Sequence, residues 1–157
     1  NHDMHYIKTE FMDCSRLNVW RRAEVHDLFM NNIDKFQLIH EVDNYLFSHA
    51  GVYLEWTKKY EITLEELFNF KKFLGGRWNT LEDVSYERGG WNKVGSCVWA
   101  DIRESVTNEL PAMFKKQIVG HTQMESKPYI TSRIACLDVR QCFILNTETD
   151  EIMETDA

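Results

Sequence analysis

The stretch Tyr45-Leu46-Phe47-Ser48-His49-Ala50-Gly51 is the most informative part of this chain, because an apolar run passes directly into a histidine and a glycine. The same pattern occurs in a second stretch, where a short apolar run breaks at a small residue beside a histidine: Gln117-Ile118-Val119-Gly120-His121-Thr122. Branched and aromatic residues favour strands, and glycine lets the backbone bend away where a strand ends. The sequence therefore predicts two strands that each present an imidazole at one end.

Shorter signals predict the other strands. Residues 36–40 are expected to form a strand that turns at Asp43-Asn44 into the Tyr45 strand. Residues 134–139 and 142–145 are expected to form a closing hairpin around Arg140-Gln141. Strands therefore dominate the last third of the chain.

Helices are expected mainly in the first half. Apolar residues recur at helical spacing over residues 25–33. Thr63 and Glu66 form a capping box before an apolar run that ends at Gly75-Gly76. A further helix is expected over residues 107–115. Together with the strands, this pattern predicts an α/β (α+β) fold class.

Composition and charge restrict the function. The chain has 157 residues, 43% of them hydrophobic and 13% aromatic, which is typical of one globular domain. A net charge of −7 makes a nucleic-acid polymer or an anionic membrane an unfavourable partner. No apolar run approaches the roughly 20 residues of a membrane span, and no signal-peptide pattern is present. We expect a cytoplasmic protein.

The four cysteines, Cys14, Cys97, Cys136 and Cys142, show none of the paired spacing that a structural zinc site requires. We expect them to be free buried thiols in a reducing compartment.

Imidazole is the commonest metal ligand near neutral pH, so His49 and His121 are candidate ligands. Either histidine alone could equally be a polar group satisfied at a strand end. The cluster Asn1-His2-Asp3 adds a third group of metal-binding side chains, and the three together favour a site.

These residues resemble the motifs of calcineurin-like metallophosphoesterases. Asn1-His2-Asp3 is similar to the end of their Gly-Asn-His-Asp/Glu motif, Phe47–Gly51 to their His-Ala-Gly motif, and 119–122 to their Gly-His-Thr motif. The order matches, and the resemblance covers residues 1 to about 146. It implies part of a two-sheet β-sandwich flanked by helices, with residues 1–157 as the C-terminal part of a single domain.

The resemblance also implies roles for particular residues. In that family two divalent metals about 3.5–4 Å apart clamp the phosphate and activate a bridging water. Asn1, His49 and His121 would be ligands of the second metal, and His2 would be the general acid. Mn²⁺ is the expected metal, with Fe or Zn²⁺ as alternatives.

The family holds its first metal mainly through Asp-x-His and Gly-Asp-x-x-Asp motifs, which residues 2–157 do not repeat. The resemblance therefore implies that the N-terminal half of the domain, about 60–90 residues, precedes Asn1. The chain alone is expected to bind metal weakly and to have little or no activity.

Other candidates are less specific. Arg103 resembles an arginine that the family places near the phosphate; it lies in the stretch Trp99-Ala100-Asp101-Ile102-Arg103. An ordinary surface arginine would give the same sequence pattern. Residues 75–95 are expected to form a long loop or lid. Its tryptophans, with Trp99, could be a platform for a nucleobase or part of the core. Asp138 lacks the following glycine of the related motif, which makes a role in the site doubtful.

The expected function is hydrolysis of phosphoesters, of the protein-phosphatase-like kind found in bacteria and phages. A symmetrical dinucleoside-tetraphosphate hydrolase is the alternative enzyme, since Asn1-His2-Asp3-Met4-His5 resembles a motif of that branch. A non-catalytic fragment that binds a metal or a partner is the third possibility. The expected substrate is a phosphoprotein, a phosphomonoester or a dinucleoside polyphosphate.

Overall fold

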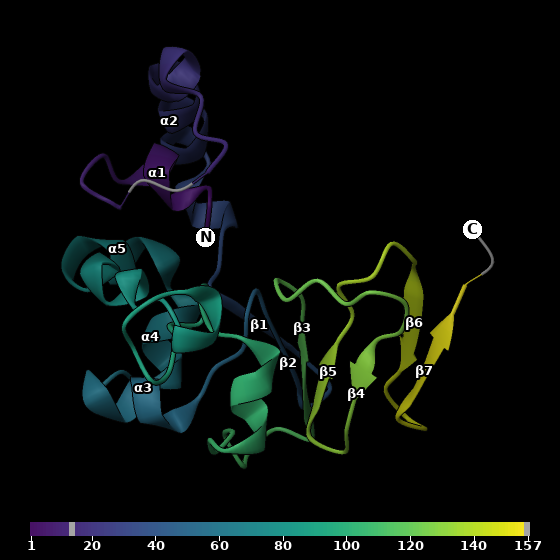
Figure 1. Ribbon diagram of the computed structural model, residues 1–157. Helices are drawn as coiled ribbons and strands as arrows, with labels where there is room; N and C mark the ends of the chain where they lie inside the picture. Colours follow the sequence, from purple (N-terminus) through teal and green to yellow (C-terminus); the bar gives the residue numbers. More distant parts are fainter. Residues whose placement is uncertain (13–14, 156–157) are drawn as a thin grey trace.

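A five-stranded mixed sheet forms the centre of the computed structural model, which describes residues 1–12 and 15–155 (Figure 1). Its strand order is β1-β2-β3-β5-β4, in which β2, β3 and β5 are parallel and the two edge strands are antiparallel to their neighbours. The strands are β1 (Ile39–Val42), β2 (Tyr45–Ser48), β3 (Lys116–Val119), β4 (Tyr129–Ile130) and β5 (Ile134–Cys136). A separate antiparallel hairpin consists of β6 (Phe143–Asn146) and β7 (Glu151–Glu154).

The helices are short and come mostly before β3. The α-helices are α1 (Met4–Ile7), α2 (Arg22–Asn31), α3 (Leu54–Lys59), α4 (Leu64–Phe68) and α5 (Phe70–Gly76). Short 3-10 helices cover Val19–Arg21, Ile33–Lys35, Trp78–Glu82, Tyr86–Arg88 and Ile102–Val106. The helical half lies on the β1 side of the sheet, and the β6–β7 hairpin packs on one face of the sheet, so the chain is an α/β protein (Figure 1). No helix among the described residues has both the length and the apolar character needed to cross a bilayer.

Several predicted local features are confirmed. Asp43 and Asn44 have φ values of 48° and 66°, so they form the tight two-residue turn between β1 and β2. The capping box of Thr63 and Glu66 is present at the start of α4. The apolar run after it is two helices rather than one, because α4 ends before Asn69 and α5 begins after it; α5 ends at Gly76, where the stop was predicted.

The predicted closing hairpin is wrong. Strand β5 is fully buried and has β3 on one side and β4 on the other, so neither of its edges is available to β6. Strand β6 pairs with β7 instead, a strand that the sequence analysis did not foresee. The competition for the edges of β5 is a non-local effect that residues 134–145 do not reveal.

The predicted helix over residues 107–115 is also absent. The helical turn comes earlier, at Ile102–Val106, because Asp101 and Glu104 form a capping box there. The later backbone is committed to other partners: the Glu109 carbonyl accepts from the Leu54 N–H at 2.9 Å, and the Lys115 N–H donates to Asn44.

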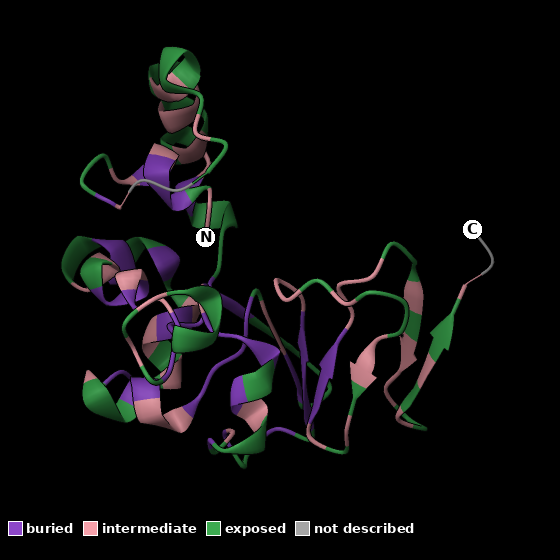
Figure 2. Cartoon of the chain, in the orientation of Figure 1, coloured by how far each residue is buried: buried purple, intermediate pink, exposed green. Residues whose placement is uncertain are grey.

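The core lies on both faces of the sheet. Leu46, Val119 and Ile134 are buried on the face that meets the helical half. Tyr45 and Ile118 are buried on the opposite face, where the β6–β7 hairpin packs. Buried residues are concentrated in the helical half and in β3 and β5, whereas the hairpin is largely exposed or intermediate (Figure 2).

Two of the described cysteines, Cys97 and Cys136, are free and buried as expected, but Cys142 is exposed. Cys14 lies outside the described residues. Residues 75–95 contain the end of α5 and two 3-10 helices rather than one long loop. Trp78 packs against the core, whereas Trp91 is 89% exposed.

Candidate functional site

The parallel pairing of β2 with β3 brings the two predicted histidines together. In this pairing Phe47 lies opposite Ile118, so both strands end at the same edge of the sheet. The pairing continues one step further, because the Gly120 N–H donates to the His49 carbonyl at 3.0 Å. The centres of the His49 and His121 rings are therefore 4.7 Å apart, although 72 positions separate the residues in the sequence.

Three candidate ligand atoms meet at this edge. His49 Nε2 lies 3.0 Å from His121 Nδ1 and 2.9 Å from Asn1 Oδ1. His121 has a φ of 65°, an uncommon conformation for a residue with a side chain. Such backbone strain is found at ligand sites, where the surrounding structure holds it. His49 Nε2 thus contacts one amide oxygen and one imidazole nitrogen directly.

The donor set fits a divalent transition metal. Two atoms that each bind one ion at about 2.1 Å lie about 3.0 Å apart at the 90° angles of an octahedron and about 3.4 Å apart at tetrahedral angles. The spacings of 2.9 and 3.0 Å match the octahedral value, and mixed nitrogen and oxygen donors suit Mn²⁺, Fe and Zn²⁺. Among the described residues no group of three or more His, Cys, Asp or Glu side chains is arranged for a metal. The set therefore has two strong donors and the amide of Asn1.

Both imidazoles are kept in the neutral form, which is the form that binds metals. Burial lowers the pKa of His49 to about 4, and the positive charge of Arg88 acts in the same direction. Burial also lowers the pKa of His121 to about 3, again with a contribution from Arg88. Neither ring is protonated near neutral pH.

The glycine after His49 has a steric function. Gly51 has a φ of +110°, and a Cβ atom there would lie 3.2 Å from the Tyr53 ring. The Ala50 N–H donates to the Cys97 carbonyl at 2.9 Å, which fixes the loop from the other side. A residue with a side chain at position 51 would therefore strain this loop.

His2, the predicted general acid, lines the same pocket. Its Nδ1 lies 2.7 Å from the Ser15 carbonyl oxygen, so Nδ1 carries the proton of that bond. The second nitrogen, Nε2, remains for proton exchange with a ligand. Trp99 lies beside both rings, at 6.1 Å from the His2 ring and edge-on to His121 at 5.6 Å. Trp99 is therefore a common neighbour of the His2 and His121 rings.

The pocket around these residues has a volume of about 780 Å³. Arg103, the predicted substrate contact, is part of its lining, as is Asp138, which the sequence analysis had doubted. Arg103 donates from Nε and Nη2 to the carboxylate of Asp101 at 2.8 and 3.2 Å. Its Nη1 also pairs with Glu87 at 2.7 Å, so this guanidinium is largely engaged by acidic groups.

Arg88 and Asp101 were not among the predicted site residues, although both line the pocket. Asp101 is fully buried and lies between the two arginines, which neutralise it. Burial would raise its pKa, but hydrogen bonds from Arg103 outweigh this and hold the pKa below its ordinary value of 3.8. No local sequence pattern indicates that Arg88 belongs to the pocket, because it lies in a turn 33 positions before His121.

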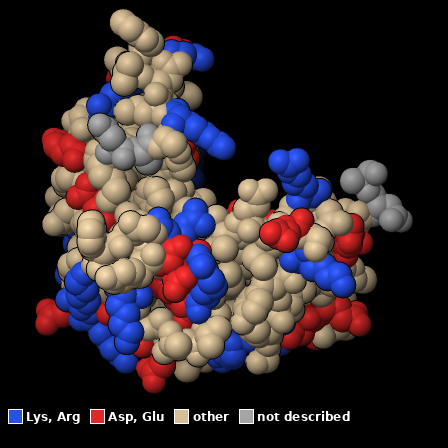
Figure 3. All heavy atoms as spheres, viewed as in Figure 1, with Lys and Arg blue, Asp and Glu red and all other residues tan. Residues whose placement is uncertain are grey.

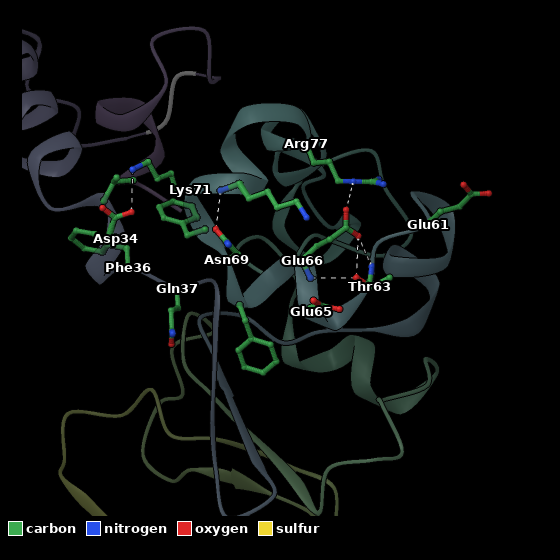
Figure 4. A pocket seen from close by; sticks show the side chains of 14 residues that line it. Asp34, Phe36, Gln37, Glu61, Thr63, Glu65, Glu66, Asn69, Lys71 and Arg77 are labelled. Carbon is green, nitrogen blue, oxygen red and sulfur yellow. Dashed lines mark hydrogen bonds and ion pairs between the residues drawn. The ribbon is translucent and has the colours of Figure 1, made fainter.

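A larger groove of about 840 Å³ lies elsewhere, between α4, α5 and the segment before β1 (Figure 4). Four of its charged side chains pair with one another: Lys71 pairs with Asp34 at 3.2 Å, and Arg77 pairs with Glu66 at 2.8 Å. Glu66 also closes the capping box of α4. The groove offers no imidazole and no converging donors, so the histidine pocket is the better candidate site.

No family model, no curated protein and no solved structure matches this chain. The assignment of a function therefore rests on the motifs and on the geometry of the pocket.

Proposed function

We propose that this chain contributes the second-metal ligands and the general acid of a metallophosphoesterase, an enzyme that hydrolyses phosphoesters with divalent metals. The observation that carries the proposal is that His49 Nε2 lies within 3.0 Å of both Asn1 Oδ1 and His121 Nδ1. These atoms belong to three motifs that are far apart in the sequence but occur in the order expected for the family.

In this proposal Asn1, His49 and His121 would hold a divalent metal, which would supply positive charge to phosphoryl oxygens and activate a water. His2 lines the pocket and uses its Nδ1–H for the Ser15 carbonyl, so as the doubly protonated imidazolium it would give the Nε2 proton to the leaving oxygen and return to the neutral ring. The φ of Gly51 and the hydrogen bond from the Ala50 N–H to the Cys97 carbonyl support a fixed position for His49.

The resemblance also predicts the finer fold, a two-sheet sandwich flanked by helices. Support comes from the β6–β7 hairpin, whose Leu145 and Ile152 pack on the sheet face formed by Tyr45 and Ile118. Side chains of both charge signs are interspersed on the face in Figure 3, which suits a compact phosphorylated substrate better than a polyanion.

Metal binding by the chain itself tests the proposal. Titration with Mn²⁺, followed by its electron paramagnetic resonance signal, should give saturable binding to one site. His49→Ala and His121→Ala should each weaken binding at least about tenfold, the usual effect of losing one ligand or its support. His40→Gln is the matched control, since His40 is an exposed histidine that contacts Gln37. Equal affinity in all four proteins would contradict the proposal.

The alternatives separate in an activity assay on the product of the complete reading frame that encodes this chain. Mn²⁺-dependent release of phosphate from p-nitrophenyl phosphate or a phosphopeptide supports the proposed reaction. A much higher kcat/KM for diadenosine tetraphosphate, with ADP as the product, would favour the dinucleoside hydrolase. The additional histidine of that branch's motif, His5, is fully buried edge-on to Phe11 and does not line the pocket. Metal binding without hydrolysis of either substrate would favour a non-catalytic protein.

A further inference from the structure

We propose that Arg88 is the residue that binds the phosphoryl group of the substrate in the histidine pocket, and that Asp101 positions it for this contact. The inference rests on the proposed function, because it names the anion contact of the same site. It assigns to Arg103 the role of anchoring Asp101 rather than that of touching the phosphate.

The two arginines differ in how far their donors are already used. All three nitrogens of the Arg103 guanidinium have acidic or carbonyl partners: Nε and Nη2 bind Asp101, Nη1 binds the Glu87 carboxylate, and Nη2 also donates to the Glu87 carbonyl at 2.6 Å. A phosphate could bind Arg103 only by displacing these groups. Such an exchange gains little, because one set of charge-assisted hydrogen bonds replaces another.

Within the described part of the chain, Arg88 keeps N–H donors that no partner uses. The one ion pair found for it among the described residues joins Nη1 to Asp101 Oδ2 at 3.7 Å, which is too long for a strong hydrogen bond. Its side chain is only 28% exposed, so the guanidinium is partly shielded from water in the wall of the pocket. A planar fork with unused donors matches the geometry of phosphate, which it can bind through two parallel hydrogen bonds.

Asp101 explains why Arg88 lies where it does. The carboxylate is fully buried, and Arg103 holds it from one side in a bidentate contact. The remaining attraction draws Arg88 toward the same carboxylate from the other side without saturating its donors. Asp101 therefore acts through Arg88 and is a positioning residue.

The backbone at Arg88 is equally constrained. Arg88 ends a 3-10 turn whose next residue, Gly89, has a φ of 81° and donates its N–H to the Tyr86 carbonyl at 3.0 Å. A Cβ atom on Gly90 would overlap the Val84 carbonyl, so the chain passes close to itself here. This closed turn limits the positions that the guanidinium can reach and directs it to the pocket.

The charge of the pocket is compatible with an anion. Among the described residues three arginines and two aspartates line it: Arg16, Arg88, Arg103, Asp101 and Asp138. The lining thus carries an excess of one positive charge before any metal binds. Arg16 is the competing candidate for the anion contact, since it is exposed at the rim of the pocket.

The test is a titration of the whole chain with inorganic phosphate in the presence of Mn²⁺, followed by isothermal calorimetry. We expect Arg88→Gln to weaken phosphate binding about tenfold or more, the usual effect of removing a charge-assisted bidentate contact. Arg88→Lys keeps the charge but loses the fork, so it should recover part of the affinity. Arg21→Gln is the control, because Arg21 is an exposed arginine that pairs with Glu24 outside the pocket.

Asp101→Asn tests the positioning role. It should weaken phosphate binding in the wild-type background but have little additional effect in the Arg88→Gln background, because it acts through the arginine. Circular dichroism of each variant, with an unchanged unfolding transition, excludes a simple loss of structure. Additive effects of the two substitutions would contradict positioning.

Several outcomes would overturn the assignment: phosphate affinity of Arg88→Gln within twofold of the wild type, a tenfold loss in Arg16→Gln or Arg103→Gln instead, or no phosphate binding by the wild type. The proposed function is judged separately by histidine-dependent Mn²⁺ binding. If that binding is present and Arg88→Gln has no effect, only the assignment of Arg88 fails. If phosphate binding depends on Arg88 but Mn²⁺ binding does not depend on the histidines, the metal site fails and an anion site remains.

Discussion

The side-chain amide of Gln117 pairs with both backbone polar groups of Val52. Its oxygen accepts from the Val52 N–H at 2.9 Å, and its nitrogen donates to the Val52 carbonyl at 2.8 Å. Gln117 is only 1% exposed and Val52 is fully buried. The contact therefore fastens the segment after His49 to β3, the strand that leads to His121.

Gln117→Met removes both hydrogen bonds while keeping most of the side-chain length. Two buried backbone groups of Val52 would lose their partner, and each such loss costs about 1–3 kcal/mol. We expect the free energy of unfolding to fall by about 2–4 kcal/mol in urea titrations. Gln141→Met, at an exposed position without a comparable contact, should change it by less than about 0.5 kcal/mol. Equal effects of the two substitutions would show that the amide pair contributes nothing.

The turn between β1 and β2 gives a second prediction. Asn44 has a φ of 66°, which asparagine and glycine tolerate and β-branched residues do not. Asn44→Val should lower the free energy of unfolding by about 1–2 kcal/mol. Asn44→Gly should leave it within about 0.5 kcal/mol of the wild type. Thermal unfolding followed by circular dichroism measures both, and a valine variant as stable as the glycine variant would refute the argument.

Asp150 joins the β6–β7 hairpin to the sheet and should make stability depend on pH. Its carboxylate accepts from Lys116 Nζ at 2.9 Å and from the Tyr45 hydroxyl at 2.8 Å, and Lys116 is only 4% exposed. Burial acts to raise the pKa of Asp150, but the hydrogen bonds from Lys116 and Tyr45 outweigh it and hold the pKa below 3.8. A lowered pKa stabilises the fold above the ordinary value, and this stability is lost as the pH falls through the folded-state pKa.

Asp150→Asn should therefore lower the free energy of unfolding by about 1–3 kcal/mol near neutral pH, because it leaves the buried Lys116 without its counter-charge. The difference from the wild type should shrink at a pH well below 3.8, as the pH falls through the lowered folded-state pKa of the carboxylate. Asparagine also tolerates the φ of 63° at this position. Asp34→Asn is the control, since its pair with Lys71 is exposed. A difference that stays constant between the two pH values would exclude the charge as its cause.

Metal binding should raise thermal stability. An ion at ten times its Kd contributes about 1.4 kcal/mol by mass action. For a chain of this length that corresponds to a rise in Tm of about 3–6 °C. Mn²⁺ should produce the rise, EDTA should reverse it, and the double variant His49→Gln, His121→Gln should lack it. Mg²⁺ should have a smaller effect, because it prefers an all-oxygen site. A rise of the same size in the double variant would show that the ion binds elsewhere.

Features that depend on a few neighbouring residues could be predicted from the sequence. The turn at Asp43-Asn44 and the capping box of Thr63 and Glu66 are confirmed because their backbone angles and hydrogen bonds are set within four positions. The apolar runs before His49 and His121 are strands, as their composition indicates. The motifs also named Asn1, His2, His49 and His121 as candidates, and the fold brings all four into one pocket.

Features that depend on competition between distant segments were decided only by the tertiary structure. The sequence could not reveal that both edges of β5 are taken, so that β6 pairs with β7, or that the turn ending at Arg88 faces the histidines. Nor could it show that Asp101, a poor neighbour for phosphate by itself, is buried between two arginines. Local dihedral angles and hydrogen bonds depend on a few neighbouring residues. Strand pairing and the contacts between charged groups depend instead on which distant segments bury their surfaces against one another when the core forms.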